Sequence, residues 1–181
     1  MSIVLQSSSG GSITINEPAT ASNFTQTLPA ATGTVMVSGN QPAFSAYSST
    51  ATQSITTAVE TKVQINTEVF DTASAFDSTT NYRFTPLVAG YYQVNGQIRI
   101  GGTLTGFCYP IIYKNGAAYK FGTASNVPAS GSILTVNDIV YLNGSTDYIE
   151  LYGVVTGTSP AFSNASEVVT SSFSAAMVRS A

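Results

Sequence analysis

One stretch decides the fold of this chain: Gly90-Tyr-Tyr-Gln-Val-Asn-Gly-Gln-Ile-Arg-Ile100. In an extended chain, successive side chains point to opposite faces. Tyr92, Val94, Ile98 and Ile100 therefore share one face, while the residues between them are mostly polar. This period of two predicts a β-strand that belongs to a sheet with one buried side.

Five more segments show a similar pattern: 61–65, 109–113, 133–142, 148–155 and 171–178. Turn signals separate them. Asn115-Gly116 predicts a tight hairpin, and Asn143-Gly144 predicts another. A helix over 51–62 is disfavoured because Thr and Ile dominate that segment. Short strands at this regular spacing predict an all-β sandwich or jelly roll.

Charge is scarce in this sequence. Of its 181 residues, 43% are hydrophobic, enough for a core, but only 8% are charged, against roughly 25% in a typical soluble domain. This predicts that much of the surface is hidden in an assembly. The basic residues stand singly, so we expect no basic groove for nucleic acid; they are Lys62, Arg83, Arg99, Lys114, Lys120 and Arg179.

Composition divides the chain near residue 40. In residues 1–40, Ile13 and Ile15 alternate with polar residues, and a turn at 29–33 lies between further apolar residues, namely Phe24, Leu28, Val35 and Val37. Such short pieces can form strands but no independent core. The segment must therefore pair with neighbouring chains or with another protein. We expect a β-rich stalk or anchor over residues 1–40 and a head over residues 41–181.

Targeting signals are not evident. The sequence has no apolar run long enough to span a membrane, and its first residues lack the basic and apolar regions of a signal peptide. We therefore expect a protein that is made in a cytoplasm, is not inserted into a membrane and is not exported by the general route.

A family pattern covers the middle of the chain. The stretch from Phe70 to Tyr92 resembles the signature of the complement-subcomponent-q globular head, a jelly roll shared with tumour necrosis factor; the matching positions are Phe70, Asp77, Phe84, Gly90 and Tyr92. Segments 42–47 and 173–178 resemble the first and last strands of that family. The chain departs from the pattern at Val94 and Gly96, where the family has aromatic residues, and by one residue in the first loop.

This resemblance implies a sandwich of about ten strands that packs as a tight homotrimer about an apolar axis. It also implies that Phe84 and Tyr92 fill the sandwich and that Gly90 permits a turn between two strands. The residues expected to pack in the core or the trimer are Phe84, Tyr92, Val94, Ile98, Tyr152 and Phe173.

The N-terminal segment carries a second resemblance. Residues 11–20 and 26–35 are similar to segments common in tail-fibre and virion proteins of bacterial viruses. This implies a bacteriophage appendage, assembled in the host cytoplasm and located in the virion, in which residues 1–40 attach to other virion proteins.

Few residues offer catalytic chemistry. Histidine is absent, which removes Ser–His and Cys–His catalysis and the commonest zinc sites. The single cysteine, Cys108, is expected to be a buried apolar side chain. Asp147 and Glu150 are close in sequence, but a glycosidase needs two carboxyl groups roughly 5 to 9.5 Å apart, one with a raised pKa. We expect exposed loop charges instead, and no enzymatic activity.

Asp71, Asp77 and Asp138 lie in predicted loops and offer oxygen ligands that could hold calcium. A calcium site needs six to eight oxygen ligands and usually a dense acidic motif. Single acids that end turns are the alternative that we favour, so no cofactor is expected.

Tyrosine is abundant, with ten copies. They cluster in the predicted sandwich, among them Tyr91, Tyr109, Tyr113, Tyr119, Tyr141, Tyr148 and Tyr152. Tyrosine suits both protein interfaces and stacking on carbohydrate. We favour packing between subunits and in the core over contact with a ligand.

Together these patterns predict a non-enzymatic virion protein, a trimeric fibre or tail tip that recognises a glycan or protein of the host surface through many weak contacts. The candidate recognition loops are 101–107 and 124–132, which are rich in small residues; the candidate residues are Gly102, Thr105, Asn126 and Ser130. The alternative function is a capsid or tail decoration protein that binds no receptor.

Overall fold

A computed structural model describes residues 3–16, 19, 25, 30, 37, 39, 41–164 and 169–181. These residues form strands and no helix, and therefore no helix long and apolar enough to cross a membrane. The strands are β1 (Ile3–Gln6), β2 (Ser12–Ile15), β3 (Ala43–Tyr47), β4 (Thr52–Ser54), β5 (Thr61–Lys62), β6 (Thr67–Asp71), β7 (Phe76–Asp77), β8 (Arg83–Phe84), β9 (Ala89–Leu104), β10 (Phe107–Lys114), β11 (Ala117–Phe121), β12 (Ser125–Asn126), β13 (Ile133–Asn143), β14 (Ile149–Val154), β15 (Gly157–Ser163) and β16 (Ser172–Ser180).

The chain divides into two compact units, Met1–Gly33 and Thr34–Ala181. In the first, β1 and β2 form an antiparallel hairpin. Its turn is closed by the Ser7 N–H, which donates to the Gly11 carbonyl at 2.7 Å. The apolar residues expected to follow it, Phe24, Leu28 and Val35, and the turn at 29–33 lie outside the described residues except for Ala30.

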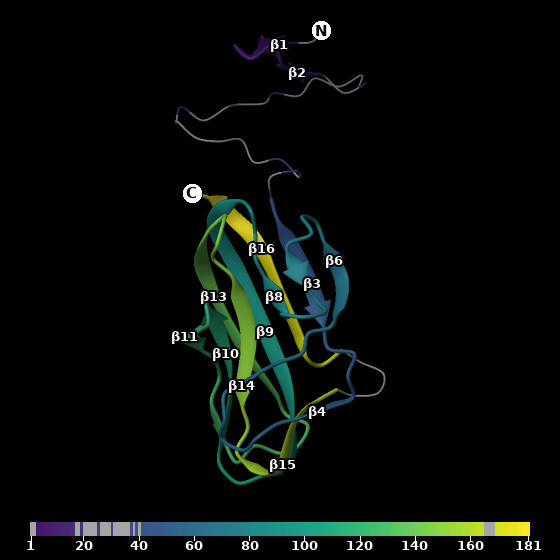
Figure 1. Cartoon of the computed structure of the whole chain (residues 1–181), viewed down its shortest axis with the longest axis vertical. Helices are drawn as coiled ribbons and strands as arrows, with labels where there is room; N and C mark the ends of the chain where they lie inside the picture. The colour runs from purple at the N-terminus through teal and green to yellow at the C-terminus, as the bar shows by residue number, and fades with distance from the viewer. Residues whose placement is uncertain are drawn as a thin grey trace. The chain divides into compact units, whose positions relative to one another are not determined.

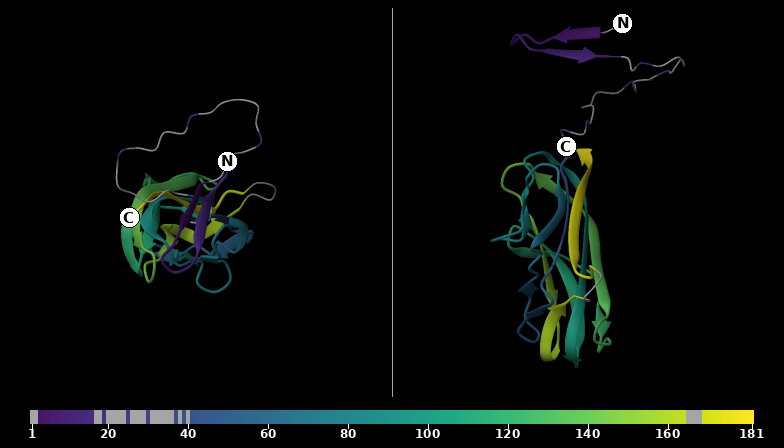
Figure 2. Two further views of the ribbon diagram at one scale, coloured as in Figure 1. Left: turned by 90° about the horizontal axis from the view of Figure 1, so that it is seen from above. Right: turned by 90° about the vertical axis from the view of Figure 1, so that its right-hand side faces the viewer.

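The head is a sandwich of two seven-stranded antiparallel sheets (Figures 1 and 2). In the first, the β9 sheet, β13 pairs along one edge of β9, while β16 and then β15 pair along the other. β3 and β6 continue beyond β16, and β4 continues beyond β15. The second, the β10 sheet, has the order β11-β10-β14-β8-β7, with β12 also paired to β10 and β5 to β14.

The core lies between the two sheets. Tyr92, Ile98 and Ile100 of β9 are fully buried in one cluster with Ile149 and Leu151 of β14, so the face predicted from the period of two is the inner face. The Tyr92 hydroxyl donates to the Val88 carbonyl at 2.7 Å, which gives this buried polar atom its hydrogen bond. The predicted jelly-roll sandwich is therefore confirmed. Short strands at its edges raise the strand number above ten.

The two predicted Asn-Gly hairpins have different outcomes. Asn115-Gly116 joins β10 to β11, with positive φ at both residues, as a tight hairpin requires. The prediction at Asn143-Gly144 is wrong, because β13 and β14 belong to different sheets. There the Asn143 side-chain oxygen accepts the N–H groups of the next turn, so this Asn-Gly pair bends the chain from one sheet to the other.

The expected role of Gly90 is also wrong. Gly90 lies inside β9, where no turn occurs. A Cβ atom built on it would lie 2.6 Å from the Arg179 carbonyl oxygen of β16. Glycine is needed here because the two backbones approach closely.

Candidate functional site

The residues expected to pack fall into two groups. Phe84, Tyr92, Val94, Ile98 and Phe173 have no exposed surface and belong to the core. Tyr152 lies outside the core, because its position on β14 points outward. Its ring is half-buried and stacks on that of Tyr113, with centroids 3.8 Å apart. Whether any of these residues also contacts a second copy stays a prediction.

The two ends of the head differ in what they hold. At one end, β3 begins next to the C-terminus, since the Met177 N–H donates to the Pro42 carbonyl at 3.1 Å (Figure 1). At the opposite end, called the distal end here, the turns β9–β10 and β14–β15 meet β12. The Thr105 N–H donates to the Thr156 carbonyl at 2.9 Å, and the Val127 N–H donates to the Gly106 carbonyl at 3.1 Å.

The four candidate recognition residues lie at or near the distal end, but their loops are shorter than predicted. Gly102 is part of β9, with a φ of +105°, and a Cβ there would lie 2.6 Å from the Ser159 carbonyl oxygen. Thr105 begins a turn of two residues between β9 and β10. Asn126 is in β12 and pairs with Phe107. Ser130 is exposed in the loop before β13.

The predicted loops 101–107 and 124–132 contain two further residues at this end, Phe107 and Val127, which sequence reasoning did not single out as candidates. Their exposed fractions are 58% and 52%, and the pairing of Phe107 with Asn126 makes them neighbours. The available signal was a large apolar residue in a loop of small polar ones. The described residues of the turns β9–β10 and β14–β15 and of 125–132 include no charged side chain.

Three of the six described non-glycine residues with positive φ lie near the distal end. Val127, Ser159 and Ala58 have φ values of 48°, 50° and 58°, and Ala58 joins this region through its N–H bond to the Val155 carbonyl. Positive φ is a genuine outlier for a β-branched residue such as Val127. Strained residues persist where the surrounding structure fixes them, often at functional sites.

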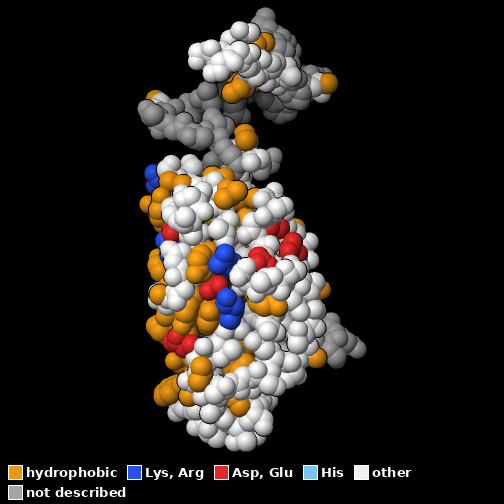
Figure 3. All heavy atoms as spheres, viewed as in Figure 1, with side chains coloured by type: hydrophobic (Ala, Val, Ile, Leu, Met, Phe, Trp, Pro, Cys, Tyr) orange, Lys and Arg blue, Asp and Glu red, His pale blue; other side chains and the backbone are white. Residues whose placement is uncertain are grey.

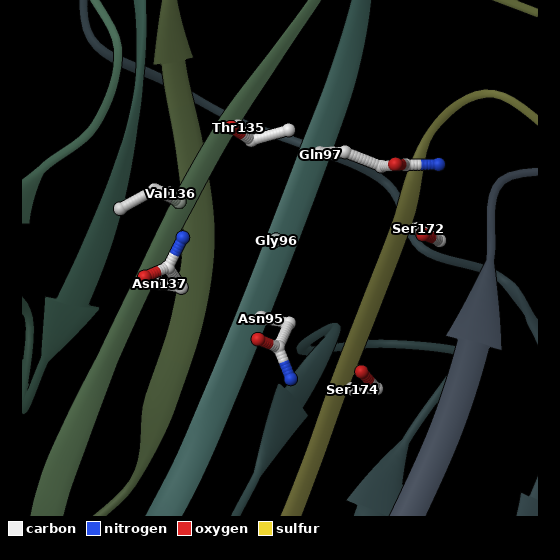
Figure 4. A pocket seen from close by; sticks show the side chains of 8 residues that line it. All are labelled: Asn95, Gly96, Gln97, Thr135, Val136, Asn137, Ser172 and Ser174. Atoms are coloured by element: carbon white, nitrogen blue, oxygen red, sulfur yellow. The ribbon is translucent and has the colours of Figure 1, made fainter.

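A second feature is a hollow of about 210 Å³ in the outer face of the β9 sheet. Neighbouring strands supply two rows of polar side chains, one through Asn95 and one through Gln97 (Figure 4). The residues that line the hollow are Asn95, Gly96, Gln97, Thr135, Val136, Asn137, Ser172 and Ser174. None of them is charged.

The polar groups of the hollow have unused hydrogen-bonding capacity. Among the described residues, only Asn95 of this set makes a side-chain hydrogen bond: its Oδ1 accepts from Gln93 Nε2 at 3.4 Å. The amides of Gln97 and Asn137 therefore present donors and acceptors to whatever covers the face.

Apolar residues flank the hollow. Tyr91 and Tyr141 pair across β9 and β13 with ring centroids 5.4 Å apart, and each is about two-fifths exposed. Ile139 lies on β13 and Val178 on β16, and both are half-exposed. We call the hollow together with these four residues the β9 outer face. These residues are uncharged, partly apolar and partly hydrogen-bonding; beyond them the same sheet face continues into Arg99 of β9, and Arg179 of β16 pairs with Tyr91.

The outer face of the β10 sheet is different, because its polar groups bind one another. Lys62 contacts Glu150 at 2.6 Å, and the Arg83 guanidinium lies 4.5 Å from the ring centroid of Tyr148. Basic and acidic side chains lie next to one another beside hydrophobic ones in Figure 3. Few of these groups remain available to a ligand.

The carboxylates considered for catalysis, Asp147 and Glu150, are buried, so the expectation of exposed loop charges is wrong, and each is held by a separate partner. Asp147 contacts Lys114 at 2.9 Å, and Glu150 contacts Lys62. Hydrogen bonds from Lys114 and Asn115 lower the pKa of Asp147, which is opposite to the change that a general acid requires. Cys108 is fully buried, and burial raises the pKa of its thiol.

The candidate calcium ligands accept hydrogen bonds from protein groups or contact a protein cation. Asp71 accepts the N–H groups of Ala73 and Phe76. Asp77 accepts N–H and O–H groups from residues 79–81, and Asp138 lies 3.4 Å from the ammonium of Lys120. The described part of the chain contains no group of three or more His, Cys, Asp or Glu side chains that could hold a metal ion.

Comparison with known proteins shows the fold. No family model and no curated protein matches the chain. Among solved structures, murine APRIL at pH 5.0 is similar with a TM-score of 0.57 and 10% identity over 76% of this chain and 99% of that one. Eiger TNF from S. frugiperda gives 0.55 and 11% over 78% and 93%. The globular domain of zebrafish complement 1qA gives 0.52 and 12% over 78% and 99%. The head thus has the jelly-roll fold of these proteins.

Proposed function

We propose that this chain is a non-enzymatic head of a bacteriophage virion appendage. Three copies associate through the β9 outer face, the distal end contacts a glycan or protein of the host surface, and residues 1–40 join the head to other virion proteins. The resemblance of residues 11–20 and 26–35 to tail-fibre segments supports the virion context. The fold and two surfaces, the β9 outer face and the distal end, support the trimer and the contact with the host surface.

The observation that carries this proposal is the β9 outer face. Monomeric proteins rarely leave large contiguous apolar patches exposed, and such patches mark interaction sites. Here exposed Tyr91 and Tyr141 lie on the same sheet face as the hollow, separated from it by one cross-strand row, and the amides of the hollow have little or no internal bonding. A second copy would bury the rings and offer hydrogen bonds to the amides. The hollow and its four flanking residues carry no charge, so none of these residues would place a like charge against its copy.

The distal end supports the binding role. An exposed aromatic residue in an uncharged setting is typical of the few side chains that dominate binding energy. Phe107 holds such a position, and its neighbour Val127 is held in a strained backbone conformation. Threefold repetition would convert weak single contacts into strong attachment.

Sedimentation of the full-length chain tests the assembly. We expect the wild type to sediment as a trimer and Ile139→Asp to sediment as a monomer, because the substitution places a charge within the β9 outer face. The control is Val69→Asp, on the exposed edge strand β6, which should remain a trimer. A wild-type chain that stays a single subunit at high concentration would overturn the proposal. A trimeric Ile139→Asp variant would rule out the β9 outer face as the trimer interface.

Electron microscopy of labelled particles tests the role in the virion. We expect the label at a fibre or tail tip, together with retention of the isolated trimer on host envelopes. A label spread over the capsid, with no retention on envelopes, would favour the decoration function instead. Release of sugar from envelopes by the purified chain would contradict the absence of catalysis.

A further inference from the structure

The β1–β2 hairpin has one face that is entirely apolar. Its register pairs Ile3 with Ile15 and Leu5 with Ile13, and because side chains alternate along a strand, these four share one face. Their exposed fractions are 59%, 54%, 55% and 69%, in that order. We call this set the apolar hairpin face. The opposite face carries Val4 and the polar side chains of both strands.

The hairpin is well defined but uncovered. Its turn has two backbone hydrogen bonds, from Ser7 to Gly11 and from Gly10 to Ser7, and Gly10 has a φ of +86°, which favours glycine. Yet a single two-stranded hairpin is marginally stable in water. Four large aliphatic side chains on one face therefore require a partner surface.

We propose that the apolar hairpin faces of three copies of this chain pack against one another and form a second assembly point apart from the head. This inference rests on the proposed trimer of heads. It identifies the partner of the apolar hairpin face as two further copies of this chain, in place of an unspecified virion protein.

The size of the face favours a tethered partner. Four side chains offer on the order of a few hundred Å² of apolar area, the size of one ordinary surface patch. An interface between two free proteins usually buries about 800 Å² on each partner. The face is thus too small to hold a free partner by itself, but large enough when the partner is already held nearby.

The heads supply such a tether. Residues 17–40 can span no more than about 90 Å even when fully extended. In a trimer of heads, each hairpin is therefore confined near two others at a local concentration on the order of 1 mM or above. Residues 3–16 contain no charged side chain, so three identical faces can approach without repulsion.

Disulfide trapping in the full-length chain tests this inference. Ile13→Cys places a thiol on the apolar hairpin face, and Thr14→Cys places one on the opposite face of the same strand. The wild type is the control without an exposed thiol, because its single cysteine, Cys108, is fully buried. Under mild oxidation we expect Ile13→Cys to form interchain dimers at least ten times faster than Thr14→Cys, at a rate that does not change on dilution.

Hydrogen exchange gives a second measurement. Backbone amides of β1 and β2 should be protected in the wild type and in Thr14→Asp, but not in Ile13→Asp. Equal trapping at both positions, or equal protection in both Asp variants, in a sample that still sediments as a trimer overturns this inference and leaves the proposed function intact. A monomeric wild type would overturn both proposals.

Discussion

Asp77 shows how one side chain organises a loop of the head. Its two carboxylate oxygens accept backbone N–H groups from Thr79, Thr80 and Asn81, and also the hydroxyl of Thr79 and the side-chain amide of Asn81. These bonds, chiefly the backbone bonds to Thr80 and Thr79, hold its pKa far below the usual value. An acid that resembles a family signature residue therefore has a structural role in closing this loop.

This hydrogen bonding predicts a loss of stability in acid. The folded pKa of Asp77 lies below its unfolded value of about 3.9, so its contribution is present above pH 4 and is lost as the pH falls toward the folded value. The lowered pKa of Asp147 acts in the same direction. We expect Asp77→Asn to reduce the free energy of unfolding by about 1–3 kcal/mol at pH 7, with a smaller difference from wild type at pH 2.

Denaturant unfolding at the two pH values measures this effect. Asp138→Asn is the control, because its carboxylate has only the Lys120 contact at 3.4 Å on the surface and a bond to the next backbone N–H, and such a surface ion pair is worth about 0–1 kcal/mol. A difference between Asp77→Asn and wild type that is the same at pH 7 and pH 2 would contradict the prediction.

At the level of elements, an aromatic cluster joins the two sheets. Phe44 of β3 stacks on Phe76 of β7 and on Phe84 of β8, with centroids 4.4 and 4.6 Å apart, and meets Phe173 of β16 edge to face at 5.4 Å. β3 and β16 belong to the β9 sheet, whereas β7 and β8 belong to the β10 sheet. These ring contacts add to the backbone pairing of the short strands β7 and β8 in the β10 sheet.

Truncation of one ring of this cluster tests how much the cluster contributes to the stability of the head. Phe44→Ala should reduce the free energy of unfolding by about 3–5 kcal/mol, because it leaves a cavity at a fully packed site. The matched control is Phe70→Ala on β6, where the ring is half-exposed, with an expected change within about 0.5 kcal/mol. Equilibrium unfolding in urea measures both. Equal losses in the two variants would show that the cluster does not join the sheets.

At the scale of the whole molecule, the distal end should determine attachment. Phe107→Ser should reduce retention of the trimer on host envelopes at least tenfold, because it removes an exposed aromatic contact. Since the turns and loop there include no charged residue among those described, retention should change little between low and high salt. Phe121→Ser is the control, since Phe121 is similarly exposed on β11. Equal retention of the two variants would exclude a role for Phe107.

The sequence predicts features that depend on neighbouring residues better than features that depend on residues far apart in the chain. The inner face of β9 follows from local alternation, so the sequence alone assigns Tyr92, Val94 and Ile98 to a core. The outward position of Tyr152 and the crossover at Asn143 depend on which sheet each strand joins, which alternation does not reveal. The hollow combines segments 95–97, 135–137 and 172–174, and only the strand order β13-β9-β16 brings them together.

The way the chain enters the head has a mechanical consequence. β3 begins at the end opposite the distal turns and pairs with β16 and β6 along its length. Hydrogen bonds between antiparallel strands are perpendicular to the strand direction. In the attachment role that we propose, tension applied through residue 41 would therefore pull β3 lengthwise and strain all of these bonds together, not one after another. Such a head would resist being torn open while it holds a moving host.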